Sequence, residues 1–119
     1  MFQKNSYSIP SDSSGVLLTK VIQTRRTSKK KHALINFFLR IVIKKIKPEL
    51  WRRRKKKTRA ICIRTKKFYY KYDGMSYKFS NNALVLLKKR MNTVGKELYG
   101  PTSKKLKIRK FRIAFNYIF

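Results

Sequence analysis

The chain has 119 residues, which is enough for one domain and leaves no room for a second hydrophobic core. Hydrophobic residues make up 42% and aromatic residues 13%, a composition that excludes a chain disordered along its whole length. The 33 lysines and arginines give a net charge of +29, so the compact state repels itself unless a polyanion neutralises it.

Nucleic acid is favoured over an anionic membrane as this polyanion. No run approaches the ~18 apolar residues needed to span a bilayer, and the longest apolar stretches, such as Ala83 to Leu87, have the length of strands. A membrane-surface peptide would show a long helical pattern with its cations on one face, whereas the periodicity here is mostly two. We therefore expect a nucleic-acid-binding protein that does not act at a membrane.

A polar turn, Ser11 to Gly15, precedes the first predicted strand, Val16 to Gln23. Gly15 is expected to adopt a positive φ, and the hydroxyls of Ser13 and Ser14 are expected to donate to phosphate. An equally good interpretation is that Asp12 orders the turn from within. The basic loop after this strand has no glycine or proline and is expected to face RNA.

The next strand has an alternating pattern, with Phe37, Leu39, Ile41 and Ile43 on one face. Pro48 ends it, because proline cannot donate to a sheet. The stretch from Glu49 to Lys57 is nearly all charge around a tryptophan. It is either a solvated loop or an extension that penetrates RNA, and we favour the second interpretation.

Three further runs predict the rest of a β-structure. Arg59 to Thr65 reads as a strand, Asp73-Gly74 between Phe68–Tyr72 and Met75–Phe79 predicts a hairpin, and Ala83 to Leu87 reads as another strand. Five or more short strands separated by turns fit a small closed antiparallel barrel with a β-ribbon and basic loops. The tyrosines of the hairpin suggest base stacking, but a position in the barrel core is favoured for most of them.

The last 30 residues differ in character. Gly95, Gly100 and Pro101 predict turns, and Thr102 can cap a short helix from Ser103 to Arg109. Cations there alternate with large apolar residues. These apolar residues are expected to pin the segment to the barrel or to a neighbour: Leu106, Ile108, Phe111 and Ile113. A flexible basic tail would leave them in water.

Catalysis and metal binding are not predicted. One histidine, one cysteine and four carboxylates are scattered along the chain without convergence, whereas acid–base or metal chemistry needs two or three such groups together. Cys62 lies in an apolar run, where a buried inert thiol is expected. We expect no cofactor, and one domain over residues 1–119, with β-barrel and basic loops in 1–90 and the turn and short-helix segment in 91–119.

Five blocks of sequence occur in a characteristic order: Ser11 to Gly15, Leu39 to Lys44, Ile63 to Lys67, Asp73 to Leu87, and Gly95 to Pro101. Together they resemble the universal large-subunit ribosomal protein fourteen family, of the bacterial type. The most specific part is Asn-Ala-x-Val-Leu-Leu followed by Gly-x-x-x-x-Gly-Pro. The resemblance covers the whole chain.

This resemblance implies a five-stranded β-barrel with a projecting β-ribbon and short C-terminal helices. It also implies a structural protein of the large ribosomal subunit, bound to large-subunit rRNA at the face that meets the small subunit. There the family helps to form an intersubunit bridge with small-subunit rRNA and touches neighbouring large-subunit proteins. A ribosome-silencing factor docks on the same face in bacteria and organelles. The alternative function is a free basic β-barrel that binds nucleic acid or acts as an RNA chaperone.

The expected site residues form two groups. Those expected to bind rRNA are Ser13, Ser14, Arg25, Arg26, Lys29, Lys30, Lys31, Arg52, Arg53, Arg54, Lys55, Lys56, Lys57, Arg64, Lys66 and Lys67. Those expected at the intersubunit or protein interface are Lys96, Glu97, Tyr99, Lys104, Lys105, Arg109 and Phe111. Arg64 could instead be a plain surface charge at the end of its strand.

The residue composition also suggests a compartment. Lys, Asn, Ile, Phe and Tyr, which have A/T-rich codons, account for 54 of the 119 residues. With a diverged bacterial-type pattern, this bias predicts a protein of the mitochondrial matrix, in the large subunit of the mitochondrial ribosome. The alternative is an A/T-rich bacterium or a plastid. No signal peptide is recognisable at Met1 to Tyr7.

Overall fold

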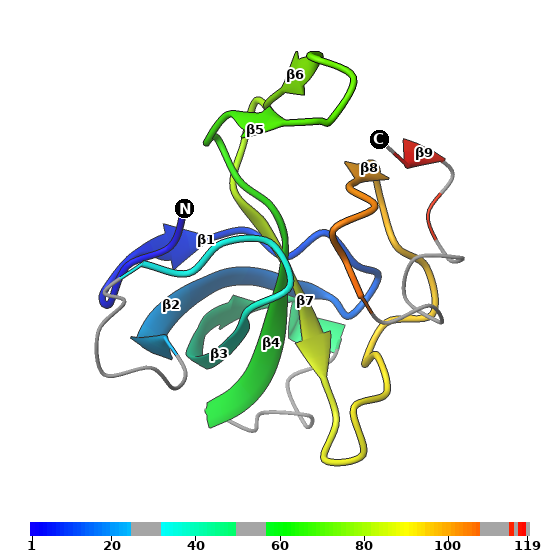
Figure 1. Cartoon of the computed structure of the whole chain (residues 1–119). Coiled ribbons are helices and arrows are strands. Elements are labelled where there is room, and N and C mark those ends of the chain that lie inside the picture. Colours follow the sequence, from blue (N-terminus) through cyan, green and yellow to red (C-terminus); the bar gives the residue numbers. More distant parts are fainter. Residues whose placement is uncertain (25–31, 50–56, 108–114, 116, 119) are drawn as a thin grey trace.

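A five-stranded antiparallel sheet forms the body of the protein (Figure 1). The computed structural model describes residues 1–24, 32–49, 57–107, 115 and 117–118. The strands follow the order β1-β2-β3-β4-β7, and their bounds are β1 Tyr7–Ser8, β2 Val16–Thr24, β3 Phe38–Ile46, β4 Lys57–Arg64 and β7 Ala83–Leu87. The strands predicted from hydrophobic alternation are confirmed, and β3 ends just before Pro48 as expected.

The sheet curls into a half-barrel, so the closed barrel predicted from the sequence is not confirmed. Its edge strands are β1 and β7. The segment after β1 reaches β7 through a bridge from Pro10 to Leu84, a hydrogen bond of 2.9 Å from the Ser11 amide to the Leu84 carbonyl, and the side chain of Asp12, which accepts from the Leu86 amide. In the described residues these contacts do not form a ladder of strand pairs between β1 and β7.

Strand β7 and the part of β4 from Ala60 onward are buried on both faces, because different parts of the chain cover each side. Ala60 and Cys62 belong to one hydrophobic cluster, whereas Ile61 and Ile63 belong to another that includes Leu106 of the C-terminal segment. Burial raises the pKa of the Cys62 thiol to about 12. The prediction of a buried thiol is therefore confirmed, and the raised pKa keeps it protonated near neutral pH.

A hairpin of β5 (Tyr69–Tyr70) and β6 (Ser76–Tyr77) projects from the sheet (Figure 1). The hairpin predicted at Asp73-Gly74 is confirmed, but only Gly74 of this pair has a positive φ, of 81°. The Lys71 amide donates to the Met75 carbonyl at 2.8 Å. The loop thus has three residues, a turn followed by a left-handed glycine, instead of two.

The C-terminal segment contains no helix in its described part, contrary to the sequence prediction. Thr102 does not cap a helix, because it lies in β8 (Pro101–Thr102), which pairs in parallel with β9 (Tyr117–Ile118). Residues 103–107 form a turn, with the Leu106 amide donating to the Ser103 carbonyl at 3.1 Å. Leu106 is fully buried, which confirms the prediction that it holds the segment against the sheet. The other three residues predicted to do so lie outside the described residues: Ile108, Phe111 and Ile113.

Across the described ranges, no helix combines the length and apolar character needed to cross a membrane.

Candidate nucleic-acid interface

The polar turn before β2 is ordered from within by Asp12. Its Oδ1 accepts from the Ser14 hydroxyl at 2.5 Å and from the Ser14 amide at 3.3 Å, and its Oδ2 accepts from the Leu86 amide at 3.1 Å. Ser14 is buried, and its hydroxyl proton is used on Asp12. The structure therefore gives Ser14 a role inside the turn, and its prediction as an rRNA contact stays a prediction. Gly15 has the expected positive φ of 80°.

Ser13 remains exposed on the same turn. Its amide donates to the Glu97 carbonyl at 3.0 Å, and its Oγ accepts from the Glu97 amide at 3.0 Å. Since the hydroxyl acts as an acceptor there, its proton can still be donated to a phosphate. The turn fits so closely on Gly95 that a Cβ at this position would lie 2.7 Å from the Ser13 nitrogen. Two of the five sequence blocks thus meet at this contact.

Arg64 is a buried residue that joins separate parts of the chain through hydrogen bonds, and it is not an exposed cation. Its side chain is only 6% exposed. The guanidinium donates to the Tyr99 and Pro101 carbonyls at 2.8 and 3.1 Å, to Asn81 Oδ1 at 3.1 Å and to Ser11 Oγ at 2.5 Å. Burial lowers its pKa. Four of its five N–H donors are thus used on protein acceptors, and its prediction as an rRNA contact stays a prediction.

A β-bulge at the end of β4 sets the direction of the Arg64 side chain. Cys62 pairs with Leu84 and Arg64 pairs with Ala83, which leaves Ile63 without a partner in β7. A bulge re-aims the side chain that follows it. Arg64 therefore joins the Ala83 side of the sheet, where the C-terminal segment packs, instead of the opposite side.

Lys66 and Lys67 are exposed where the chain leaves β4 for the projecting hairpin. The Lys66 amide donates to Asn82 Oδ1 at 2.9 Å, which fixes the backbone while the side chains face solvent. This placement agrees with their prediction as phosphate contacts. The hairpin itself adds the exposed cations Lys71 and Lys78.

The hairpin has one packed face and one exposed face. Tyr69, Tyr77 and Phe79 pack with Ile35 in a small cluster apart from the core of the sheet. Tyr70 and Tyr72, by contrast, are almost wholly in solvent. The prediction that most of these rings belong to a barrel core is therefore wrong.

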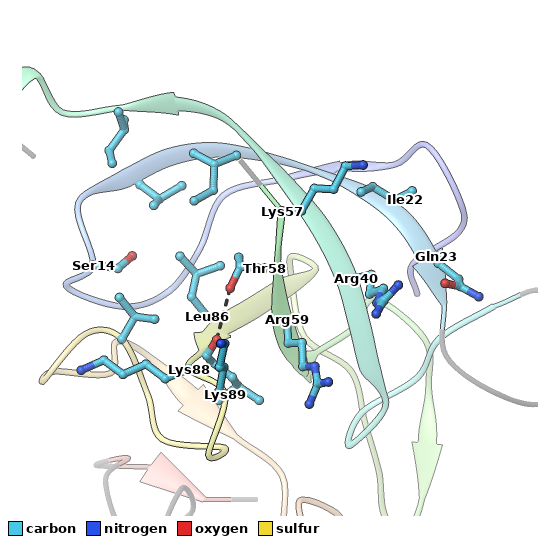
Figure 2. Close-up of a pocket in the computed structure, with 15 residues that line it drawn as sticks. Ser14, Ile22, Gln23, Arg40, Lys57, Thr58, Arg59, Leu86, Lys88 and Lys89 are labelled. Carbon is cyan, nitrogen blue, oxygen red and sulfur yellow. Dashed lines mark hydrogen bonds between the residues drawn. The ribbon is translucent and has the colours of Figure 1, made fainter. Parts of the chain in front are cut away.

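A hollow with a volume of about 930 Å³ lies between the sheet and the chain after β7. Figure 2 shows the side chains that line it. Its walls include the apolar side chains of Val16, Ile43 and Leu86, and the cations at its edge are Arg40, Lys57, Arg59, Lys88 and Lys89. None of the described residues that line it is acidic. A hollow of this kind suits an anion with an apolar or aromatic part, such as a nucleotide.

Arg40 and Arg59 stand directly opposite each other in β3 and β4 (Figure 2). Like charges in this relation destabilise a sheet, and a bound phosphate would remove the cost. We predict that Arg59→Gln stabilises the free protein at low salt by about 0.2–1 kcal/mol while it weakens RNA binding and lowers the salt slope by ~1. Thermal melting and RNA titration at several salt concentrations measure the two effects.

The matched control is Lys45→Gln, because Lys45 is an exposed β3 cation whose cross-strand partner is Leu18 rather than another cation. It should leave the melting temperature unchanged. Equal gains from both variants would mean that general charge reduction, and not the Arg40–Arg59 pair, governs stability.

The predicted interface residues are exposed where the structure describes them. Lys96, Glu97 and Tyr99 lie in the segment that meets the Asp12 turn, and Lys104 and Lys105 follow β8. The Lys105 Nζ lies 4.4 Å from the centre of the Tyr69 ring, which joins this segment to the hairpin. Both basic loops fall mainly outside the described residues, as do these predicted residues: Arg25, Arg26, Lys29, Lys30, Lys31, Arg52, Arg53, Arg54, Lys55, Lys56, Arg109 and Phe111.

Sequence reasoning missed the cations of the hollow. Arg40 and Arg59 are isolated in the sequence, whereas the prediction followed runs of adjacent cations. Both arginines occupy polar positions of two strands that pair with each other. To predict that they lie opposite each other, the register of the two strands must be known. Lys57, which was counted with the basic loop, instead begins β4 at the edge of the hollow.

Metal chemistry finds no support in the described part of the chain, where no group of three or more His, Cys, Asp and Glu residues is placed to hold an ion.

Comparison with known proteins places the chain in a family. Residues 1–116 match the family model described as "Ribosomal protein L14p/L23e". The chain is also similar to the "Large ribosomal subunit protein uL14m" of Tetrahymena pyriformis. The two are 36% identical over 115 residues, which cover 97% of each chain.

Proposed function

Since the chain belongs to the ribosomal protein L14p/L23e family, whose members are structural proteins rather than enzymes, we propose that it binds large-subunit rRNA and helps to form an intersubunit bridge. The observation that carries rRNA binding is the hollow of Figure 2, with its apolar walls and cationic edge. The net charge of +29 supplies the long-range attraction.

The relative from Tetrahymena pyriformis bears the mitochondrial form of the family name, uL14m, and the present chain is a mitochondrial member as well. The bias toward residues with A/T-rich codons agrees with this compartment. We place the protein in the matrix, in the large subunit of the mitochondrial ribosome. Its partners there are large-subunit rRNA and neighbouring ribosomal proteins.

The bridge is supported by the way the C-terminal segment is held. Leu106 is buried in the cluster of Ile61 and Ile63, while Lys104 and Lys105 beside it are exposed. Cations held by a buried neighbour can meet phosphates of the small-subunit rRNA without the ordering cost of a free tail. Lys96, Glu97 and Tyr99 would form the adjoining surface for a neighbouring protein or a ribosome-silencing factor.

The bridge is tested with Lys104→Gln/Lys105→Gln in mitochondrial ribosomes. We expect the large subunit to assemble and subunit joining to fall, with the largest defect at low salt, because high salt already screens these ionic contacts in the unaltered protein. Sedimentation of subunits and monosomes through density gradients measures both. Lys44→Gln/Lys45→Gln is the control, since these are adjacent exposed cations on β3. Normal joining by the first variant would contradict the bridge.

The alternative, a free RNA chaperone, is separated from a subunit protein by a salt wash. A structural protein should remain with the large subunit in a high-salt gradient, whereas a chaperone held only by charge should be released. Release of the unaltered protein under conditions that retain other large-subunit proteins would overturn the structural assignment to this position.

A further inference from the structure

The outer face of the β5–β6 hairpin carries aromatic rings that the fold does not use. Tyr70 is 76% exposed, whereas its neighbour Tyr69 is 6% exposed. Tyr72, at the loop, is fully exposed, and Phe68 is half exposed. Strand alternation places Phe68 and Tyr70 on the face opposite Tyr69. Three aromatic rings are thus exposed to solvent on a short projecting hairpin, and packing in the core does not explain why they are aromatic.

The surroundings of these rings are cationic. Lys66, Lys67, Lys71 and Lys78 are exposed on the hairpin and at its base, and the Lys78 Nζ lies 4.8 Å from the centre of the Phe68 ring. The single carboxylate, Asp73, accepts from the Met75 amide at 3.0 Å and so shapes the loop. A protein partner that buried these rings would also have to neutralise the lysines, whereas RNA brings its own phosphates.

The hairpin is also held in place from its inner face. The Tyr69 hydroxyl lies 2.6 Å from Thr65 Oγ1 and accepts from the Ile35 amide at 3.4 Å. The Tyr77 hydroxyl forms a hydrogen bond with Ser103, and Lys105 packs on the Tyr69 ring. The outer rings therefore sit on a support that is ordered before a ligand arrives, which lowers the entropic cost of binding.

We propose that this outer face binds unpaired nucleotides of RNA, whose bases stack on Tyr70 and Tyr72 while the lysines contact the flanking phosphates. The proposal rests on RNA binding by the protein and deepens it by naming the class of RNA that the hairpin takes. Unpaired bases expose their faces to aromatic side chains, whereas a continuous duplex keeps its bases stacked on one another.

The test compares Tyr70→Leu and Tyr70→Phe in the full chain, titrated with a single-stranded oligonucleotide and with a duplex of the same length. Leucine keeps an apolar side chain and removes the ring, and phenylalanine keeps the ring. We expect Tyr70→Leu to lose about tenfold in affinity for the single strand, Tyr70→Phe to bind normally, and neither to change duplex binding. The salt slope should stay the same, because no cation is lost.

Tyr7→Leu is the matched control, because Tyr7 is an exposed tyrosine, also beside a lysine, on β1. It should have no effect on the single strand. The proposal is overturned if Tyr70→Leu binds like the unaltered chain, if Tyr7→Leu loses as much, or if single strand and duplex lose equally. Failure of the unaltered chain to bind either RNA would instead refute the proposed function.

Discussion

Replacement of Arg64 by glutamine is expected to lower the free energy of unfolding by about 3 kcal/mol or more, the largest loss we predict for a polar residue. The guanidinium donates to Ser11, Asn81, Tyr99 and Pro101. Hydrogen bonds to a charged group are worth about 1.5–3 kcal/mol each, and an acceptor left buried without a donor adds a further penalty. Denaturant unfolding of the free protein measures the loss.

Arg64→Lys should recover only part of this stability, because an ammonium offers three donors from one point and cannot span four acceptors. The control is Arg90→Gln, at an exposed arginine, which should stay within about 0.5 kcal/mol of the unaltered protein. If Arg64→Gln were as mild as the control, the side chain would be a surface charge available to RNA, as the sequence first indicated.

The second large effect is expected for Leu106→Ala. Leu106 is fully buried among Ile61, Ile63 and Leu87, and truncation of such a leucine costs about 2–5 kcal/mol. We expect the cost to appear first as detachment of the C-terminal segment, because Leu106 is its anchor on the sheet. Subunit joining should therefore fail while the half-barrel still assembles with rRNA. Gradient sedimentation and protease sensitivity of the segment follow the two steps.

Leu17→Ala serves as the control, since Leu17 lies on β2 with 46% of its side chain exposed. It should cost much less stability and leave joining intact. Normal subunit joining by Leu106→Ala would mean that the C-terminal segment is a basic tail that follows phosphate without being held.

The strands were predictable because each is an alternating or a continuous apolar run that ends near residues that disfavour a sheet. Leu39 and Ile41 on β3 face the core, and Pro48 follows the strand end. Asp73-Gly74 marked the hairpin. What local pattern could not supply was closure of the barrel, since closure depends on how far the sheet curls and on whether β1 and β7 are long enough to pair.

The differences at single residues have related causes. Arg64 and Ser14 are polar residues beside cationic or hydroxyl-rich blocks, so the sequence suggested RNA contacts for both. In the structure both side chains form hydrogen bonds inside the protein. Arg64 is turned inward after a bulge in β4, and Ser14 donates to Asp12. Most of the hairpin rings were assigned to the barrel core, because the separate cluster around Tyr69 depends on Ile35, which is distant in sequence.

The C-terminal helix was predicted from a capping residue and an alternation of cations with apolar side chains. Helical propensity is a weak preference that tertiary contacts override. Here the Thr102 hydroxyl donates to the Ile63 carbonyl at 3.2 Å, and Pro101 and Thr102 pair with β9. The Thr102 hydroxyl is thus bonded to β4, whereas the hydroxyl of a helix cap accepts from the amides of the residues that follow it.

The contact between the Asp12 turn and the segment after Gly95 has a consequence for synthesis on the ribosome. Ser13 and Glu97 are 84 positions apart, and Asp12 and Leu86 are 74 apart. A chain that grows from its N-terminus cannot make these contacts until most of its length has emerged, and such distant pairings form slowly. The nascent protein therefore carries its unneutralised cations and unpaired strand edges until translation is nearly complete.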